Sequence, residues 1–180
     1  KAQDNSPDRS GQAADFTTST VTITVAGTND GPVATFTTSQ SATEDGSVLS
    51  GQLTATDLDT NDSRTYSLVG GAIPGFSLNT SGAWSFNPAN AAYQSLRAGQ
   101  SQLVPVTYQV TDGAGANSQA SFTITVSGTN DTPVATFTAR QTATEDAAVI
   151  SGQLTSTDVD AGDIRAFSLV GSAIPGLSIS

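Results

Sequence analysis

The sequence has 180 residues, 36% of them hydrophobic, and a formal net charge of −10 from 16 acidic and 6 basic side chains. This length fits one or two domains. The shortage of basic side chains excludes the positively charged surface that a nucleic-acid partner requires. The acidic balance instead favours solubility and an attraction for cations.

The sequence contains no Cys, Met or His. The absence of Cys excludes a disulfide scaffold and thiolate metal sites. The absence of His removes the commonest acid–base residue and the usual transition-metal ligand. No segment approaches the roughly 20 apolar residues of a membrane span, so we expect no membrane insertion. Lys1 begins no signal peptide, which indicates a fragment of a longer chain.

A repeat with a period of 101 residues organises the chain. The segments 31–79 and 132–180 are identical at 31 of 49 paired positions, with Asp57 corresponding to Asp158. The Asn-Asp pair that precedes each segment repeats with the same offset. We therefore expect the closing strand and linker of one unit at 1–30, a complete unit at 31–131, and the first half of another unit at 132–180.

Apolar residues that alternate with Thr or Ser predict short, half-buried strands. Glycine-rich turns separate these strands, and Pro88 to Leu96 is the one segment that favours a helical turn. Such short strands at near-regular spacing predict an all-β chain of Greek-key β-sandwiches with an Ig-like architecture. In chain order the expected strands fall at 21–25, 48–55, 84–86, 106–110 and 122–126.

Acidic residues follow the ends of the predicted strands and do not lie along them. The strand ends of a sandwich collect at its two poles, so acids that are far apart in the sequence can converge in space. Two carboxylates about 5 Å apart repel by roughly 3 kcal/mol at an effective dielectric of 20, which predicts a bound cation. The acidic signatures are Thr-Glu-Asp at 43–45, Asp-Leu-Asp at 57–59 with Asp62, Thr-Asp-Gly at 111–113, and the linker Asn130-Asp131.

Calcium is the cation that this set of ligands favours. It takes roughly six to eight oxygens from carboxylates, carbonyls and water, whereas zinc favours the His and Cys that are missing here. An EF-hand is excluded because position six from Asp57 is Asp62, not Gly, and position twelve is Leu68, not Glu. For Asp112, which precedes Gly113, a purely local hydrogen-bonding role in a turn is an equally good explanation.

A series of motifs in a fixed order spans the complete unit: TEDG (43–46), SGQLTATDLD (50–59), YSL (66–68), GAWSF (82–86), AYQSL (92–96), TYQVTDG (107–113) and GTND (128–131). With these motifs the unit resembles the VCBS or cadherin-like repeats of large bacterial RTX-type surface adhesins. This resemblance implies tandem β-sandwiches with calcium at their junctions. One departure is Asn87-Pro88-Ala89-Asn90, where cadherins place an acidic motif, and it implies fewer or weaker ions per junction.

The resemblance also implies how the ligands divide between the two poles of the complete unit. Its Asp-x-Asp and Thr-Asp-Gly acids would face the linker Asn29-Asp30 at one pole. At the opposite pole, Glu44 would lie beside the next linker and the acids of the next unit, where Glu145 repeats Glu44. The expected calcium ligands are Asn29, Asp30, Glu44, Asp57, Asp59, Asp62, Asp112, Asn130, Asp131, Glu145, Asp158, Asp160 and Asp163.

We expect no enzyme and no catalytic residues in this chain. Without His or Cys the common nucleophilic triads cannot be built. Carboxylate pairs can cleave glycosides, but a sugar platform needs aromatic side chains, which make up only 6% of the residues. The aromatic residues expected to pack the core instead are Trp84, Phe86, Tyr93 and Tyr108.

These observations predict a calcium-stiffened extender of a secreted, cell-surface bacterial adhesin that acts in cell adhesion and biofilm formation. Its partners would be neighbouring repeats of the same chain, with host or surface ligands bound by other domains. Two alternatives stay open: a module that itself binds carbohydrate or a receptor, and an ion-independent spacer in a secreted enzyme. Because residues 132–180 lack the strands that close a sandwich, we expect that half-unit to be partly exposed or disordered, with an open edge that invites pairing with another chain or with residues 20–25.

Overall fold

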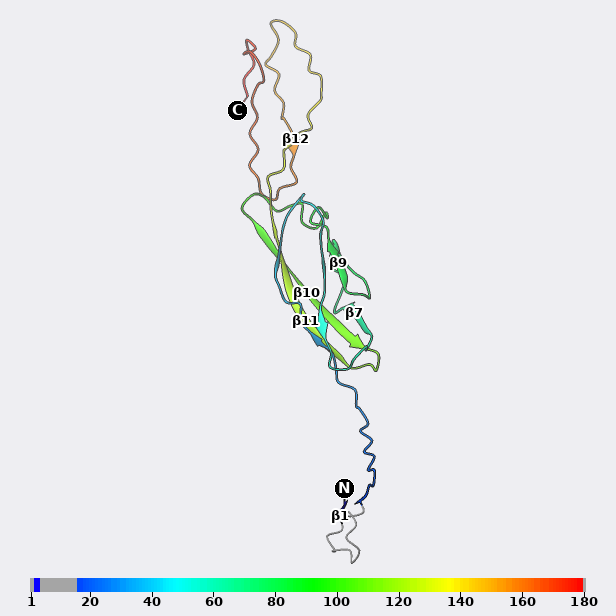
Figure 1. The fold of residues 1–180 in the computed structure, drawn as a ribbon. Helices are drawn as coiled ribbons and strands as arrows, with labels where there is room; N and C mark the ends of the chain where they lie inside the picture. The colour runs from blue at the N-terminus through cyan, green and yellow to red at the C-terminus, as the bar shows by residue number, and fades with distance from the viewer. Residues whose placement is uncertain (1, 4–15, 180) are drawn as a thin grey trace, which may run out of the picture.

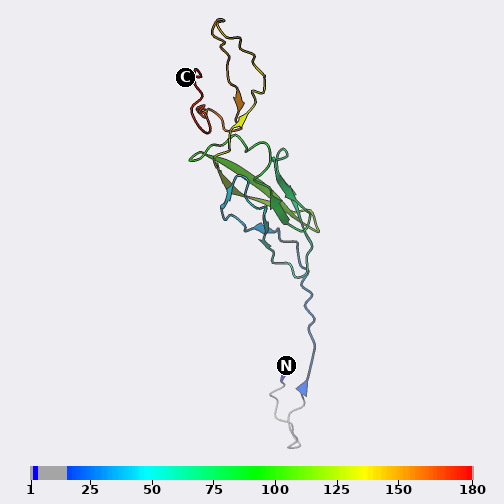
Figure 2. The ribbon, with the colours of Figure 1, turned by 90° about the horizontal axis from the view of Figure 1, so that it is seen from above.

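The computed structural model describes residues 2–3 and 16–179, and every regular element among them is a β-strand. No helix in this described part is long and apolar enough to cross a membrane. Figures 1 and 2 show an elongated molecule whose parts follow one another in series. The strands are β1 (Ala2–Gln3), β2 (Phe16–Thr17), β3 (Val33–Ala34), β4 (Gln40–Thr43), β5 (Leu49–Gln52), β6 (Ala55–Thr56), β7 (Arg64–Leu68), β8 (Phe76–Leu78), β9 (Ala83–Phe86), β10 (Ser101–Asp112), β11 (Asn117–Ser127), β12 (Val134–Ala135) and β13 (Ser156–Thr157).

The central unit, residues 31–131, is a β-sandwich, as the sequence predicts. One sheet has the strand order β4-β11-β10-β7, and the other contains β5-β9-β8. The long antiparallel hairpin of β10 and β11 runs from the pair Ser101↔Ser127 to the pair Thr111↔Asn117. β4 pairs in parallel with the end of β11, so Thr43 lies opposite Ser127 at one pole of the sandwich. The hairpin therefore connects the two poles of the unit.

The core follows from the alternation of side chains along the strands. Every second residue of β10 from Val104 to Val110 is buried, and the same holds for β11 from Phe122 to Val126. Trp84 of β9 packs against Phe122 with ring centroids 5.5 Å apart. Complete burial of such a side chain contributes about 1.5–3 kcal/mol. The four aromatic residues expected in the core are all buried there: Trp84, Phe86, Tyr93 and Tyr108.

Residues 88–96 form a series of turns, not the helical turn that Pro88 suggests. The amides of Tyr93 and Leu96 each donate to the carbonyl three residues earlier. The side chain of Asn87 accepts from the amide of Ala89, and that of Asn90 accepts from Ala92. These local side-chain hydrogen bonds favour turns over a continuous helix.

Residues 18–32 form an extended segment without strand pairing, so the strand predicted at 21–25 is wrong in this structure. Val21 and Val25 are 81% and 88% exposed. The corresponding residues of the central unit belong to β11 and pair with β10. By the repeat, the counterpart of β10 falls at 1–11, of which only 2–3 are described, and these pair with β2. A strand is stabilised by its neighbour, and alternation alone does not supply one.

The last segment keeps the opening of the repeat. β12 pairs with β13 through Val134↔Thr157, in the register that β3 and β6 have 101 residues earlier through Val33↔Thr56. Many apolar side chains beyond it are exposed, including Val170 at 100%, which agrees with the expected partial exposure.

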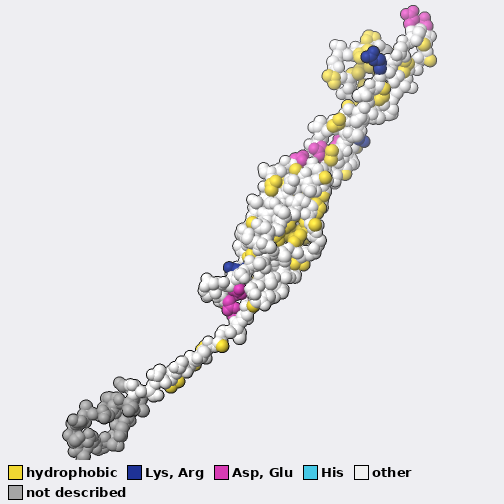
Figure 3. All heavy atoms as spheres, turned by 90° about the vertical axis from the view of Figure 1, so that its right-hand side faces the viewer, with side chains coloured by type: hydrophobic (Ala, Val, Ile, Leu, Met, Phe, Trp, Pro, Cys, Tyr) yellow, Lys and Arg dark blue, Asp and Glu magenta, His cyan; other side chains and the backbone are white. Residues whose placement is uncertain are grey.

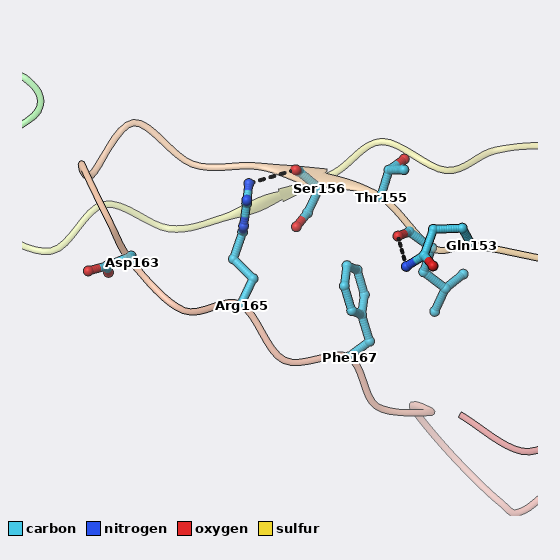
Figure 4. A pocket seen from close by; sticks show the side chains of 7 residues that line it. Gln153, Thr155, Ser156, Asp163, Arg165 and Phe167 are labelled. Carbon is cyan, nitrogen blue, oxygen red and sulfur yellow. Dashed lines mark hydrogen bonds between the residues drawn. The ribbon is translucent and has the colours of Figure 1, made fainter. Parts of the chain in front are cut away.

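A hollow of about 410 Å³ lies beside Phe167 and Arg165 in this last segment (Figure 4). Arg165 donates to the carbonyl of Ser156 at 2.8 Å. In the central unit, Tyr108 of β10 occupies the equivalent place, and its hydroxyl lies 3.4 Å from the carbonyl oxygen of Thr54. The hollow is therefore a core position of the sandwich and gives no sign of a ligand site.

The substitution Gly51→Ala should destabilise the central unit. A Cβ on Gly51 would lie 2.6 Å from Cζ2 of Trp84, its cross-strand partner. Overpacking of this kind costs about 1–3 kcal/mol. We expect a lower midpoint in thermal unfolding followed by circular dichroism. Gly152→Ala is the matched control because nothing lies within 4 Å of a Cβ at that equivalent position. Equal midpoints for the two variants would contradict this packing.

Candidate metal centres

Two groups of three carboxylates lie at opposite poles of the central unit. In each group, one oxygen from every residue lies within 4.8 Å of the others. We call Asp57, Asp62 and Asp112 the N-terminal cluster, and Glu44, Asp131 and Asp160 the C-terminal cluster. Figure 3 shows acidic side chains gathered at the two ends of the central unit and at the far tip of the chain.

Glu44 enters the C-terminal cluster from the turn that follows β4. Its amide donates to the carbonyl of Ser127 at 2.9 Å, which extends the pairing of β4 with β11. The turn closes through the amide of Gly46, which donates to Thr43, and Asp45 has a positive φ of 59°. Asp tolerates this left-handed conformation better than most residues. The turn thus aims a buried carboxylate at the linker.

The linker and the next unit supply the other two carboxylates of the C-terminal cluster. The amide of Asp131 donates to Oδ2 of Asp160 at 2.8 Å. The amide of Asp160 donates to Oδ1 of Asp158 at 3.1 Å, which folds the Asp-x-Asp segment into a tight turn. The amide of Thr129 donates to Oε1 of Glu44 at 3.3 Å. The cluster therefore joins the central unit, the linker and the next unit.

Several oxygens of these carboxylates are buried without a hydrogen-bond donor. In the C-terminal cluster they are Oε2 of Glu44, Oδ2 of Asp131 and Oδ1 of Asp160. In the N-terminal cluster the corresponding atom is Oδ2 of Asp57. Buried polar atoms in folded proteins are almost always paired. One free oxygen on each of three converging carboxylates is the arrangement that an oxygen-binding cation requires.

Burial and mutual repulsion both act on the C-terminal cluster. Burial raises the pKa of Glu44 above 4.5, opposed by the hydrogen bond from Thr129 and reinforced by the charges of Asp131, Asp45 and Asp160. Burial likewise raises the pKa of Asp131 above 3.8, together with the charges of Asp45 and Asp160. The folded chain therefore disfavours these charges unless a cation neutralises them.

The N-terminal cluster uses more of its oxygens in hydrogen bonds within the protein. Oδ1 of Asp112 accepts from the amides of Ala114 at 3.0 Å and Ala116 at 2.8 Å, which stabilises the turn between β10 and β11. Its Oδ2 accepts from the side chain of Asn29 at 2.9 Å, and this bond is the main reason why the pKa of Asp112 lies below 3.8. The local role weighed for Asp112 is therefore present, and the residue faces the linker as well.

The two linkers make the same hydrogen bond, one at the N-terminal pole and the other at the C-terminal pole. The amide of Asp30 donates to Oδ2 of Asp59 at 2.8 Å, as Asp131 donates to Asp160. Oδ1 of Asp62 accepts from the amide of Gly113 at 3.2 Å. A hollow of about 590 Å³, lined in part by Asn29, Asp59 and Asp62, lies beside this pole. The N-terminal pole thus offers both oxygen ligands and open space.

The structure brings most of the predicted ligands to the two poles but leaves some outside the clusters. Asn29, Asp30, Asp59 and Asp158 hydrogen-bond to cluster residues or to linker residues beside them. Asn130 donates to the carbonyl of Asp131 and is exposed. Glu145 is exposed in the last segment, and Asp163 lies outside the three carboxylates of the C-terminal cluster.

Two contributions escaped the prediction of site residues. Asp45 adds a negative charge that acts on both Glu44 and Asp131. Thr129 donates to Glu44 from its backbone and lies 3.5 Å away through its hydroxyl. Asp45 belongs to the Thr-Glu-Asp signature at 43–45 and Thr129 to the GTND motif at 128–131, so the sequence singles out both segments. Their roles depend on distances that the sequence does not contain.

Comparison with known proteins gives one family match and several similar solved structures. Residues 29–128, more than half of the chain, match the family described as the bacterial cadherin-like domain. The chain is similar to the structure of human protocadherin-24 EC1-2 at 26% identity and a TM-score of 0.46, over 75% of this chain and 62% of that chain.

Two further solved structures are similar over comparable parts of this chain. The protocadherin GammaB4 extracellular domain matches at 16% identity and a TM-score of 0.41, over 73% of this chain and 24% of that chain. Human CDH23 EC21-23 matches at 20% identity and a TM-score of 0.46, over 73% of this chain and 47% of that chain. The chain spans less than two thirds of each of these three structures. No curated protein is similar to the sequence.

In the presence of EDTA, the chain should become more stable as the pH falls from neutral towards 4.5. The raised pKa values of Glu44 and Asp131 mean that the folded chain binds these protons more readily than the unfolded chain. The stability they remove at neutral pH therefore returns as the pH falls through the raised pKa values. The lowered pKa of Asp112 has the opposite effect on the pH dependence of stability, but the stabilisation that it contributes is lost only below the ordinary pKa of 3.8. Thermal unfolding across this pH range measures the effect, and a steady loss of stability would contradict it.

The substitution Glu44→Gln should raise the unfolding midpoint in a buffer without divalent cations and lower it in a buffer that contains calcium. Without a divalent cation, Gln removes a buried charge and should raise the unfolding midpoint by a few degrees. With calcium, the same change removes a ligand and should lower the midpoint relative to the unsubstituted chain. Glu145→Gln at the equivalent exposed position is the control and should have little effect in either buffer. If Glu44→Gln shifts the midpoint in the same direction in both buffers, Glu44 is not a metal ligand.

Proposed function

Since the chain belongs to the family of bacterial cadherin-like domains, we propose that its units are calcium-stiffened extenders of a large bacterial surface adhesin. The observation that carries this proposal is the C-terminal cluster. Its three carboxylates come from the central unit, the linker and the next unit, and each has a buried oxygen without a donor. A cation bound at a site shared in this way would couple the neighbouring units.

Carboxylate repulsion is the basis of the proposed mechanism. Without a cation, Glu44, Asp131 and Asp160 repel one another across the junction, and the linker can relieve the repulsion by moving the units apart. A bound calcium ion would supply the compensating positive charge. The three carboxylates could then stay together, and the linker would be held between the units. The acidic groups would therefore act as joints that stiffen with calcium.

Calcium fits this proposal better than other biological cations. The candidate metal ligands in the two clusters are all carboxylate oxygens, which zinc and copper sites rarely use alone. Magnesium demands near-ideal octahedral geometry and keeps several waters, whereas calcium accepts irregular sets of carboxylates and carbonyls. Extracellular calcium modules typically bind with a dissociation constant of about 10⁻⁴–10⁻³ M, so calcium outside the cell would keep the joints occupied.

The same proposal assigns the chain a mechanical role without catalysis. The acidic groups recur at successive ends of repeated units, a layout that suits joints along an array better than a single active site. The units would extend a binding domain elsewhere in the parent protein away from the cell surface, for attachment to a host or within a biofilm. Under this proposal the chain would lie outside the cell, as part of a VCBS-type array in an RTX-type adhesin.

Millimolar calcium should raise the unfolding midpoint of this chain by several degrees relative to excess EDTA. Calcium should also narrow the range of shapes in small-angle scattering, because it holds the units in line. The variant Asp160→Asn should lose most of the effect on scattering and part of the effect on the midpoint, since it removes a carboxylate of the C-terminal cluster and leaves the N-terminal cluster intact. Asp146→Asn is the matched control, because it removes one exposed acid at a position where Asn tolerates the positive φ of 58°.

An equal concentration of magnesium serves as the ion control and should have a much smaller effect. If calcium changes neither the midpoint nor the scattering, the stiffening mechanism is wrong. The ion-independent spacer would then be the better explanation of the same fold.

A further inference from the structure

The turn that follows Tyr93 reaches across the C-terminal junction to the next unit. The carbonyl of Ser95 accepts a hydrogen bond from the amide of Ala161 at 3.1 Å. The guanidinium of Arg97 donates to the carbonyl of Gly162 at 3.3 Å and lies 4.0 Å from Oδ1 of Asp163. These contacts join protein atoms directly and involve no metal ion. Neither Ser95 nor Arg97 belongs to the C-terminal cluster.

The turn is also packed against the start of the linker. A Cβ on Gly128 would lie 2.0 Å from the carbonyl oxygen of Leu96 and 2.5 Å from that of Arg97. The amide of Gly128 donates to the carbonyl of Gln100 at 2.9 Å. Gly27 opens the equivalent linker, and nothing lies within 4 Å of a Cβ there. Glycine at 128 is therefore what allows the turn to lie directly on the linker.

Asp163 shows that the two poles use equivalent acids differently. Its counterpart Asp62 belongs to the N-terminal cluster and accepts from the amide of Gly113. Asp163 lies outside the C-terminal cluster and faces Arg97. This is the one ion pair within residues 2–3 and 16–179. The acid that the repeat marks as a metal ligand thus meets a protein cation at this junction.

We propose that the turn 93–97 is an interaction surface for the ligand-bearing loop 158–163 of the next unit, and that it holds this loop without a metal ion. We call this contact the junction bracket: Ser95 and Arg97 on one side, Ala161, Gly162 and Asp163 on the other. The loop carries Asp158 and Asp160, so the bracket keeps part of the metal site assembled before the ion binds. The role given to the metal site rests on the proposed function, but the bracket itself does not.

The bracket acts through its geometry more than through its charge. The side chains of Arg97 and Asp163 are 45% and 26% exposed, and an ion pair in such a position contributes little by itself. Three contacts over three consecutive residues nevertheless fix both the position and the orientation of the loop. Gly162 has a φ of 81°, and Asn61 at the equivalent position has 66°, so the loop presents its carbonyl groups in the same way in both units.

The test is the distance distribution between two spin labels across the junction, measured by pulsed electron paramagnetic resonance on the whole chain. Ser67→Cys and Ser168→Cys place labels at exposed, equivalent positions of the two units, and the chain has no other cysteine. In EDTA, Arg97→Ala should give a broader distribution than the parent chain. Arg97→Lys keeps the charge but not the planar donor and should also broaden it. Arg140→Ala removes an exposed arginine elsewhere and should leave the width unchanged.

Gly128→Ala provides an independent test because its Cβ would push the turn off the linker, while Gly27→Ala is its matched control. Circular dichroism should show that each variant keeps its strands. Equal widths in EDTA for the parent chain, Arg97→Ala and Gly128→Ala would overturn the bracket. A calcium titration separates the two proposals: with the bracket, Arg97→Ala should need more calcium to reach the parent width. If calcium narrows the distance distribution of neither the parent chain nor Arg97→Ala, the proposed function is wrong. The comparison of widths in EDTA still tests whether the bracket exists.

Discussion

The repulsion among buried carboxylates at the ends of the sandwich is the constraint on which the rest of this structure depends. Oxygens of Glu44, Asp131 and Asp160 lie within 4.8 Å of one another, and one oxygen of each is buried without a hydrogen-bond donor. Such an arrangement is rare in folded proteins. The acids of the two clusters lie outside the hydrophobic core of the sandwich. Inward-facing residues of β10 and β11 stabilise the middle of the unit, and the acids are confined to the turns at its ends. The hydrophobic core and the acidic clusters are thereby located in different parts of the molecule.

The long hairpin of β10 and β11 links these two regions. At one end, its turn is held by Asp112, which also accepts from Asn29 of the preceding linker. At the other end, β11 runs directly into the next linker, and Gly128 lies under the turn that carries Arg97. A continuous paired element therefore spans the unit from one junction to the other. The rest of the unit is arranged around this hairpin.

Much of this arrangement could be predicted from the sequence, and the failures have physical causes. Period-two patterns located the strands wherever a neighbouring strand was available, as for Val106 to Val110. The same pattern at Val21 to Val25 produced no strand, because pairing depends on a partner that a local pattern does not reveal. The turns after Pro88 were mistaken for a helical turn because the side-chain hydrogen bonds of Asn87 and Asn90 compete with it.

The candidate site divides in the same way. The acids were recognised because like charges recur at strand ends, and a repeat shows which of them correspond. The sequence could not show that Asp163 faces Arg97 while Asp62 faces Gly113, because that difference arises between units. Nor could it show which carboxylate oxygens lack donors. Spacing predicts which residues can meet, whereas three-dimensional contacts decide which oxygens remain free.

The bond between the linker and the second acid of the Asp-x-Asp segment has the same length, 2.8 Å, at both junctions. Wherever the same joint links similar units, each unit is rotated and displaced from the previous one by the same operation, and a superhelix results. The pitch of such a superhelix is determined by the joint and not by the sandwich. A small angular change at one kind of joint therefore accumulates along the array. In an array built with such joints, a few linker residues would therefore influence its course as much as the sandwiches do.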